Sequence, residues 1–468
     1  MKANLRHLSP HGSDANPGTE AAPWRTPAHA LRQLQPGDTL IFADGIYPTS
    51  EPLVLSMGTP APAGAWTTLR AAARARPVIL AEHAAGDDHD LHGEQGWLRL
   101  ERSSRIRLIG LTVKNSPRGG ISVHEGCTGI EILGCRIDRS SDFGIGIWNA
   151  SGIRVIGNDV FEANHAQRRP DGDTSGRDRS AQEALSLGNV TDFEVAWNRV
   201  HAGGKEGIDI KRPSQRGRVH HNLVHDMARQ GIYLDARRTG VMREIEVDHN
   251  ISFHNGWGIG LSTEQATARM EQVHIHHNLI YANRGSGLII APWVQDGPRS
   301  DIVIENNTLV HNGTRLVSWA GSLGNLDLRT ANLSDADIRK NLCVDGGAFD
   351  IATLFPTDRA KAELAHRRIR IAGNRAAPAA SFGATRAGDF PRPWPWDGEQ
   401  AIHDRPIFVA PEAGDFRLAP ENPVHLLALG AFADTDADWA AEVRSRAGHL
   451  PAASAPQTVS ISPSLRQS

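Results

Sequence analysis

The sequence predicts an all-β protein: a right-handed parallel β-helix, a solenoid in which short strands wind into stacked coils. Three observations support this fold. A short segment carrying an asparagine recurs at intervals within the roughly 20–50 residues typical of repeat folds. Each interval holds two or three short runs of alternating β-branched and polar residues, broken by Gly, Asn or Asp. No interval shows the periodicity of helical repeats. Such small coils cannot bury their own apolar faces, so they must stack around a shared core.

The recurring segment reads "VIGNDV", "VAWNRV", "VHHNLV", "VDHNIS", "IHHNLI" and "IENNTL", followed by weaker copies. Its asparagines are Asn158, Asn198, Asn222, Asn250, Asn278, Asn307, Asn341 and Asn374. In two earlier copies, Leu111 and Cys135 stand at this position. Asn tolerates a left-handed backbone and bonds to neighbouring backbone groups. We therefore expect these asparagines to be structural and to stack from coil to coil.

The two ends of the predicted solenoid differ from its middle. In "TPAHALRQLQ", Thr26 suits a helix N-cap and Pro27 the first helical position, which predicts a short capping helix. A cap protects the open edge of the first coil from pairing with other chains. We expect one domain over residues 1–450, with a cap in about 1–36, regular coils in about 37–375 and irregular wrapping in about 376–450. Residues 451–468 are predicted to form a mobile tail.

Composition excludes several classes of protein. The chain has 468 residues, of which 40% are hydrophobic, and its net charge of −3 gives no field that attracts nucleic acid or an anionic membrane. Its three cysteines form no CxxC pair, which argues against a zinc cage or a disulfide framework. No apolar run reaches the roughly 20 residues of a membrane span. No secretory signal is recognised, so localisation stays open between the cytoplasm and, if a signal has been removed, an exported location. The oligomeric state is not predicted.

Charged residues gather on one predicted strand face. The first strands of successive coils are "EALSL", "EGIDIK", "QGIYLDA", "WGIGLSTE" and "SGLIIAPW". Aligned, they place on one outward face the residues Glu183, Ser186, Glu206, Asp209, Lys211, Tyr233 and Asp235, with Glu264 and Trp293 at strand ends. Coils about 4.8 Å apart bring these acids together, so a cation is expected among them. Lys211 is one candidate. Calcium bound by Glu183, Glu206 and Asp209 is another.

Other residues are assigned to ligand contact. Arg229 and Arg237 flank the "QGIYLDA" strand and are assigned to substrate binding. Trp257 and Trp293 have two interpretations, since they can stack on sugar rings or plug coil corners. The polar, arginine-bearing segment 165–182 enters the coil just before Glu183 and is a candidate groove wall, or else a solvated loop. The His-rich stretches are interpreted as solvated strand faces.

The chain resembles the right-handed β-helix proteins that act on polysaccharides, the pectate-lyase-like group, over about residues 5–430. Within it, the site segments are most similar to family 9 polysaccharide lyases. The resemblance implies that an acid on one coil and a "DDGxD"-like segment on the next hold calcium, while a lysine abstracts the substrate's C5 proton. Glu183 matches the first acid, and "KEGID" supplies Glu206 and Asp209, with Lys205 in place of another acid. The family's lysine segment corresponds to "GIYLDA", so Tyr233 stands at or near the lysine position.

The predicted function is therefore cleavage of a polysaccharide or oligosaccharide by β-elimination at a uronic acid. Lys211 lies among carboxylates that should raise its pKa, which favours Tyr233 as proton carrier and Lys211 as an electrostatic clamp. The alternative is a glycoside hydrolase or glycan-transferring enzyme that uses Asp209, Asp235 and Glu264 as paired carboxylates. A third hypothesis is a non-catalytic carbohydrate-binding β-helix, although structural faces usually disperse like charges. The substrate and an endo or exo preference are not decided at this level.

Overall fold

The computed structural model describes residues 4–58, 61, 64–82, 94–165, 182–314, 324–355, 357–375, 392–393, 406–422, 429–433 and 438–449. The chain divides into two compact units. Unit 1 comprises Met1–Glu206 with Arg446–Thr458, and unit 2 comprises Gly207–Ser445 with Val459–Ser468. The organisation of the chain as a single domain stays a prediction.

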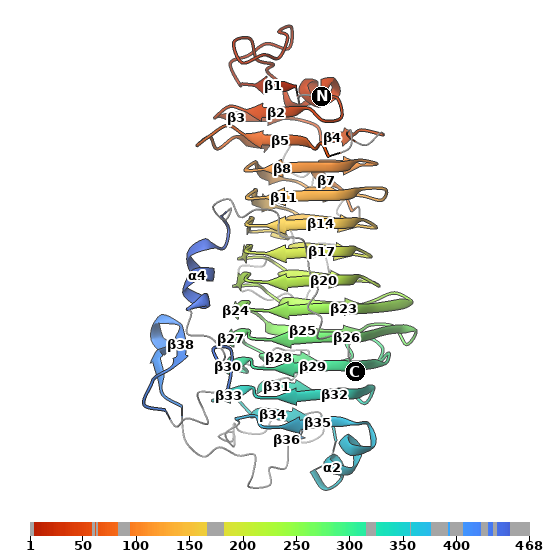
Figure 1. Ribbon diagram of the computed structural model, residues 1–468, viewed down its shortest axis with the longest axis vertical. Coiled ribbons are helices and arrows are strands. Elements are labelled where there is room, and N and C mark those ends of the chain that lie inside the picture. The colour runs from red at the N-terminus through yellow and green to blue at the C-terminus, as the bar shows by residue number, and fades with distance from the viewer. Residues whose placement is uncertain are drawn as a thin grey trace. The chain divides into compact units, whose positions relative to one another are not determined.

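Unit 1 is built of three parallel sheets, to which each full coil contributes one strand (Figure 1). Sheet A consists of β1 (Leu5–Leu8), β2 (Thr39–Phe42), β5 (Thr67–Ala71), β8 (Ser104–Ile109), β11 (Thr128–Leu133), β14 (Ser151–Ile156) and β17 (Thr191–Ala196). Sheet B consists of β3 (Ile46–Thr49), β6 (Val78–Ala81), β9 (Thr112–Ser116), β12 (Arg136–Ser140), β15 (Asp159–Phe161) and β18 (Arg199–His201). Sheet C consists of β4 (Leu53–Ser56), β7 (Gly96–Glu101), β10 (Gly119–Val123), β13 (Ile145–Trp148) and β16 (Leu185–Gly188).

Unit 2 repeats the three-sheet arrangement. Its part of sheet A consists of β20 (Gln215–His220), β23 (Gly240–Asp248), β26 (Ala268–His276), β29 (Arg299–Glu305), β32 (Leu333–Arg339) and β35 (Ile369–Ala372). Sheet B consists of β21 (Leu223–His225), β24 (Ile251–Phe253), β27 (Leu279–Tyr281), β30 (Thr308–Val310) and β33 (Leu342–Val344). Sheet C consists of β19 (Ile208–Lys211), β22 (Gln230–Ala236), β25 (Trp257–Thr263), β28 (Leu288–Ile290), β31 (Gly324–Leu328), β34 (Phe349–Thr353) and the antiparallel β36 (Arg392–Pro393).

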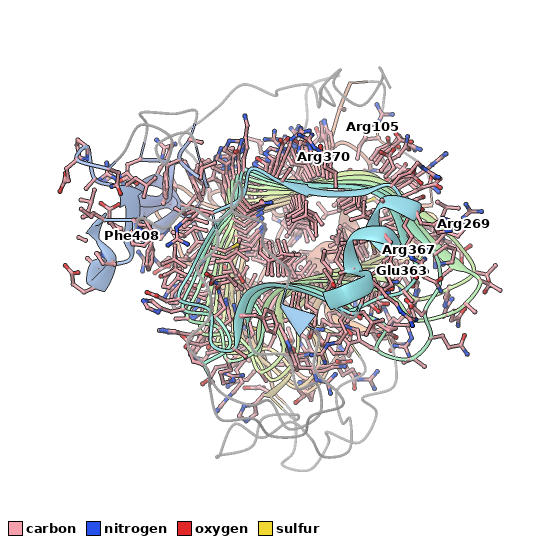
Figure 2. The ribbon with its side chains drawn as sticks, turned by 90° about the horizontal axis from the view of Figure 1, so that it is seen from below. Arg105, Arg269, Glu363, Arg367, Arg370 and Phe408 are labelled. Atoms are coloured by element: carbon pink, nitrogen blue, oxygen red, sulfur yellow. The ribbon has the colours of Figure 1, made fainter. Side chains whose placement is uncertain are left out.

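Aliphatic side chains on the inner face of each strand form the core. In unit 2 the register aligns Ile208, Ile232, Ile259 and Leu288 on successive strands of sheet C, and all four are fully buried. Each such side chain contributes roughly 1.5–3 kcal/mol by leaving water. Polar residues alternate with them on the outer face, as the period of a strand requires. In the view along the coils, Arg269 and Arg370 project away from the interior (Figure 2). The predicted parallel β-helix is confirmed.

The repeated asparagines form the predicted ladder. Asn250 Nδ2 donates to Asn278 Oδ1 at 3.0 Å, and Asn278 Nδ2 donates in turn to Asn307 Oδ1 at 2.9 Å. All three side chains are fully buried, and their remaining amide hydrogens reach backbone carbonyls of the coil. A second asparagine ladder, which the sequence analysis did not predict, runs through Asn255, Asn283, Asn312 and Asn325.

The N-terminal cap is also confirmed. Helix α1 (Pro27–Gln33) begins with proline at its first turn, and Thr26 is the N-cap, whose side chain accepts from the His29 N–H. Asp14 strengthens this start by accepting the Thr26 hydroxyl hydrogen at 2.6 Å. No helix in the described part of the chain is long and apolar enough to cross a membrane.

After β35 the regular coils end. The C-terminal segment contributes the antiparallel strands β37 (Phe408–Ala410) and β38 (Asp415–Leu418), the 3-10 turn Pro411–Ala413 between them, and helix α4 (Trp439–Arg446). Helix α2 (Thr357–His366) precedes β35, and Glu363 pairs with Arg367 beside it at 3.6 Å (Figure 2). Most of segment 165–182, parts of the predicted wrapping and the predicted tail lie outside the described residues.

Candidate functional site

The predicted charge cluster of unit 2 lies on the outer face of sheet C. Strand alternation sends Ile208 and Ile210 into the core, so Asp209 and Lys211 face outward from β19. The register places Tyr233 of β22 opposite Asp209, and Asp235 opposite Lys211. The four side chains that the sequence analysis assigned to one face are therefore brought together by two adjacent strands.

Asp209 and Lys211 form a buried ion pair. Lys211 Nζ lies 3.4 Å from Asp209 Oδ2, and the exposed fractions of the two side chains are 4% and 0%. Asp235 on the next strand is only 2% exposed. Burying charges costs several kcal/mol per ion before pairing compensates, and apolar residues of similar volume are often at least as stable. The ion pair by itself is therefore no evidence of added stability.

Tyr233 connects the buried pair to the end of the next strand. Its hydroxyl donates to Glu264 Oε1 at 3.1 Å, and Glu264 Oε2 lies 3.5 Å from Arg237 Nε. Burial raises the pKa of Tyr233 well above its usual value, and the nearby carboxylates of Asp235 and Glu264 raise it further. At neutral pH Tyr233 is thus a neutral phenol that can donate a proton.

The residues assigned to substrate binding differ in exposure. The Arg237 side chain is 60% exposed at the edge of the cluster, and Arg229 is half-buried. Trp257 is fully buried against Ile289, and its ring lies 5.4 Å from that of the half-buried Trp293. In this structure Trp257 therefore supports its neighbours, as the packing interpretation holds, and Trp293 is the tryptophan of the pair with accessible surface.

Unit 1 contains two of the three predicted calcium ligands. Glu183 and Glu206 begin adjacent strand segments, because the Ala184 N–H donates to the Glu206 carbonyl at 3.0 Å. Ser186 Oγ donates to Glu183 Oε2 at 2.9 Å, and Lys205 Nζ lies 3.8 Å from Glu183 Oε1. The lysine already supplies positive charge where the resemblance implies another acid. Asp209, the third predicted ligand, belongs to unit 2.

The sequence analysis missed a second pair on the outer face of sheet C in unit 2. Asp327 of β31 lies opposite Ile289, and its Oδ2 is 3.5 Å from Arg329 Nη2. Ser286 Oγ donates to the same Asp327 oxygen at 3.4 Å. The signal was present, since "LDLR" at 326–329 repeats the apolar–acid–apolar–base pattern of "IDIK" at 208–211. The alignment of first strands ended one coil too early to include it.

Another group of potential metal ligands lies on sheet A of unit 2. Carboxylate and imidazole atoms of Glu246, Asp248 and His276 lie within 4.8 Å of one another. However, Arg218 donates to both oxygens of Asp248 at 2.7 Å, and His276 Nε2 lies 2.9 Å from Glu246 Oε1. These side chains already occupy oxygens of both acids, so we interpret the group as structural.

Comparison with known proteins agrees with this architecture. Residues 87–271 and 178–333 match the protein family described as right handed beta helix region. The uncharacterized protein YwoF of Bacillus subtilis (strain 168) is 26% identical over 382 residues, which cover 73% of this chain and 74% of that protein.

Several solved structures have similar folds. Pectate lyase Pel9A gives a TM-score of 0.50 at 14% identity and covers 91% of both chains. A hyperthermoactive exopolygalacturonase from Thermotoga maritima gives a TM-score of 0.54 at 12% identity, and the match covers 76% of this chain and 91% of that one. A family 28 exopolygalacturonase from Yersinia enterocolitica gives a TM-score of 0.51 at 11% identity. The match covers 75% of this chain and 74% of that one. At such low sequence identities, the similarity to these structures establishes the fold alone.

Proposed function

Because the chain belongs to the right-handed β-helix family, we propose that it is a carbohydrate-active enzyme with its site on the outer face of sheet C in unit 2. The observation that carries the proposal is the buried Asp209–Lys211 pair, placed in register with Tyr233 and Asp235. Proteins of similar fold include a pectate lyase and exopolygalacturonases, which supports an acidic glycan as substrate.

The preferred reaction is β-elimination at a uronic acid. A base removes the C5 proton, the electron pair forms the C4–C5 double bond, and the C4–O4 bond breaks with the leaving oxygen taking up a proton. Lys211 would hold the substrate carboxylate and make the C5 proton more acidic. Tyr233, kept neutral by burial, would donate to the leaving oxygen. Asp235, which lies opposite Lys211, would serve as the base.

Hydrolysis is the second candidate, and the contact between Tyr233 and Glu264 favours it. That hydrogen bond adds a third carboxylate to the cluster, so Asp209, Asp235 and Glu264 lie on or beside three successive strands of one face. A pair of such acids can act as proton donor and water-activating base.

One assay separates these proposals. The purified full chain is incubated with a panel of acidic polysaccharides, and both near-ultraviolet absorbance and reducing ends are followed. A lyase produces unsaturated ends that absorb, whereas a hydrolase produces reducing ends without that absorbance. Binding without either product would support the non-catalytic hypothesis. The proposal would be contradicted if no acidic polysaccharide in the panel gave either product or bound to the protein.

Calcium binding at the acids of unit 1 is a separate proposal. When bound there, calcium would supply positive charge beside Glu183 and Glu206. Glu183 and Glu206 have the oxygen donors that calcium prefers, but the ammonium group of Lys205 competes beside Glu183. We therefore expect weak calcium binding that strengthens in Lys205→Asn, measured by calorimetry with CaCl2 and EDTA controls. Equal heats of binding in both proteins would argue against a calcium site at these acids.

A further inference from the structure

Unit 1 contains a cavity that the proposed reaction does not use. Its volume is about 630 Å³, within the range of about 300–1,000 Å³ that is typical of small-molecule sites. Strands β6, β9 and β12 of sheet B contribute residues at or next to their C-terminal ends. The wall of the cavity includes Leu80, Glu82, Asn115 and Arg139.

The register of sheet B brings two of these side chains together. The residue pairs on either side of Asn115 and Arg139 are in register between β9 and β12, so the two residues lie next to each other on adjacent strands. Strands of one sheet are about 4.8 Å apart, which places the Asn115 amide and the Arg139 guanidinium within reach of one ligand. Glu82 directly follows β6, the strand on the other side of β9. Three successive strands therefore supply an acid, an amide and a base to one cavity.

The polar groups of this cavity are only partly engaged by the protein. Arg139 Nε lies 3.4 Å from Glu162 Oε2, and 50% of the arginine side chain is exposed. That contact involves one of the five N–H donors of a guanidinium. The Glu82 carboxylate and the Asn115 amide make no hydrogen bond or ion pair with the residues that the structure describes. All three side chains thus have donors or acceptors to offer a ligand.

The lining favours a neutral ligand that has hydroxyl groups. A carboxylate only accepts hydrogen bonds, a guanidinium only donates them, and an amide does both. Glu82 and Arg139 carry opposite charges, so a purely anionic or cationic ligand would meet one group of its own sign. A hydroxyl group can donate to Glu82 or accept from Arg139 without this cost. Leu80, which is half-buried, adds an apolar surface for ring carbons.

We propose that this cavity is a second binding site, which takes a neutral sugar unit. The choice of a sugar among neutral hydroxylated molecules rests on the proposed function, since a carbohydrate-active enzyme meets sugars in every substrate. Glu82 accepts hydrogen bonds from the sugar, Arg139 donates to it, and Asn115 does both. No bond of the sugar is broken here, so the site holds a glycan and adds affinity. It extends recognition from acidic sugars, which the site of unit 2 takes, to neutral ones.

Calorimetry tests the choice of ligand on the full chain with Asp209→Leu and Lys211→Met, which removes the charges that would bind a carboxylate in unit 2. The probes are galactose and glucose, each beside its uronic acid, together with arabinose, xylose and rhamnose. A neutral sugar should bind, and more tightly than its uronic acid, because Glu82 repels a carboxylate. Glu82→Gln should narrow that difference about fivefold, as expected for one unit-charge repulsion at about 4 Å in water. Failure of every neutral sugar to bind, or equal or tighter binding of the uronic acids, would overturn the inference.

Substitutions in the cavity test its location. Arg139→Gln should weaken binding of the neutral sugar about tenfold, because a charged donor is lost, and Asn115→Gly about fivefold. Glycine suits the left-handed backbone of Asn115 at φ 55, and Asn149→Gly, the same exchange at φ 53 outside the cavity, is the matched control.

Thermal unfolding shows whether each variant keeps the fold. The wild type and the protein with Asp209→Leu and Lys211→Met should bind the neutral sugar equally, so that failure of the proposed reaction and failure of this site are separate results. Unchanged affinity in both Arg139→Gln and Asn115→Gly, an equal loss in Asn149→Gly, or weaker binding without the charges of unit 2 would place the sugar elsewhere and overturn the inference.

Discussion

The outer faces of sheets A and C in unit 2 carry similar residue types but arrange them differently. On sheet A, acids and bases form short contacts, such as Arg218 to Asp248 at 2.7 Å and His276 to Glu246 at 2.9 Å. On sheet C the pairs are longer, at 3.4 Å for Lys211 and Asp209 and 3.5 Å for Arg329 and Asp327, and the aspartates are fully buried.

Under the proposed function, this difference separates charges that hold coils together on sheet A from charges that serve the site on sheet C. On sheet A each acid has basic residues on its own or neighbouring strands, so the contacts stabilise the stacking of coils. The Arg218 side chain there is 41% exposed, so its contact with Asp248 avoids full desolvation of both partners. On sheet C both aspartates are fully removed from water, which costs free energy that their pairing has to offset. The following predictions test this contrast, from the largest expected effect to the smallest.

Replacing the Asp209–Lys211 pair by Leu and Met should abolish activity and preserve the fold. We expect activity to fall by on the order of 10²–10⁴-fold, because the charged groups at the reacting residue are lost. The melting temperature should stay the same or rise, since apolar residues replace a buried ion pair. Initial rates and calorimetric melting are measured together. A large loss of stability would mean that the pair is structural, like those of sheet A.

The reverse result is expected for Arg218→Ala on sheet A. The buried carboxylate of Asp248 would lose its fork-shaped partner and keep only the contact with His249, which should lower the free energy of unfolding by about 1–3 kcal/mol. Activity per folded molecule should not change. Urea denaturation gives the stability, and Arg269→Ala, an exposed arginine on the same sheet, is the control. A loss below about 1 kcal/mol would contradict the structural role.

Tyr233→Phe tests the proton donor. It removes the hydroxyl that bonds to Glu264, and kcat should fall by about 100-fold with little change in KM. Because burial holds the pKa of Tyr233 well above its usual value, the wild-type rate should show no loss of this donor up to about pH 9. Glu264→Gln retains an acceptor for the hydroxyl, so it should lower kcat less than Tyr233→Phe does if Tyr233 is the proton donor. A larger loss in Glu264→Gln would favour the hydrolase assignment.

His221 on the sheet A side should make stability depend on pH. Burial, with the neighbouring His220 and His249, lowers the pKa of His221 to about 3, so folding favours its neutral form. This stabilisation is complete above the unfolded-state pKa of about 6.5 and is lost as pH falls from there towards 3, by at most about 1.4 kcal/mol per pH unit. His221→Asn, which suits the left-handed backbone at φ 54, should flatten this slope in urea denaturation at pH 5 and pH 7.

Local patterns in the sequence predicted much of this molecule. Alternation fixes the directions of Ile208 and Asp209, because successive side chains of a strand always point to opposite faces. The recurring asparagine gives the period of the coil. It also predicts a ladder of stacked asparagines, since each copy contacts its equivalent one coil away. The same alternation and stacking predict Tyr233 and Asp235 beside the Asp209–Lys211 pair.

Only the tertiary structure decided what each charge contacts and how far it is removed from water. Nothing local distinguishes the tight contact of Arg218 from the looser one of Arg329, because partner distance depends on register between strands and on what covers the face. The bond from Tyr233 to Glu264 and the burial of Trp257 depend on side chains from neighbouring coils. The sequence by itself determined the coil and the direction of each side chain. Stacking alone determined which charges meet and how far each is removed from water, since those contacts form between residues far apart in the chain.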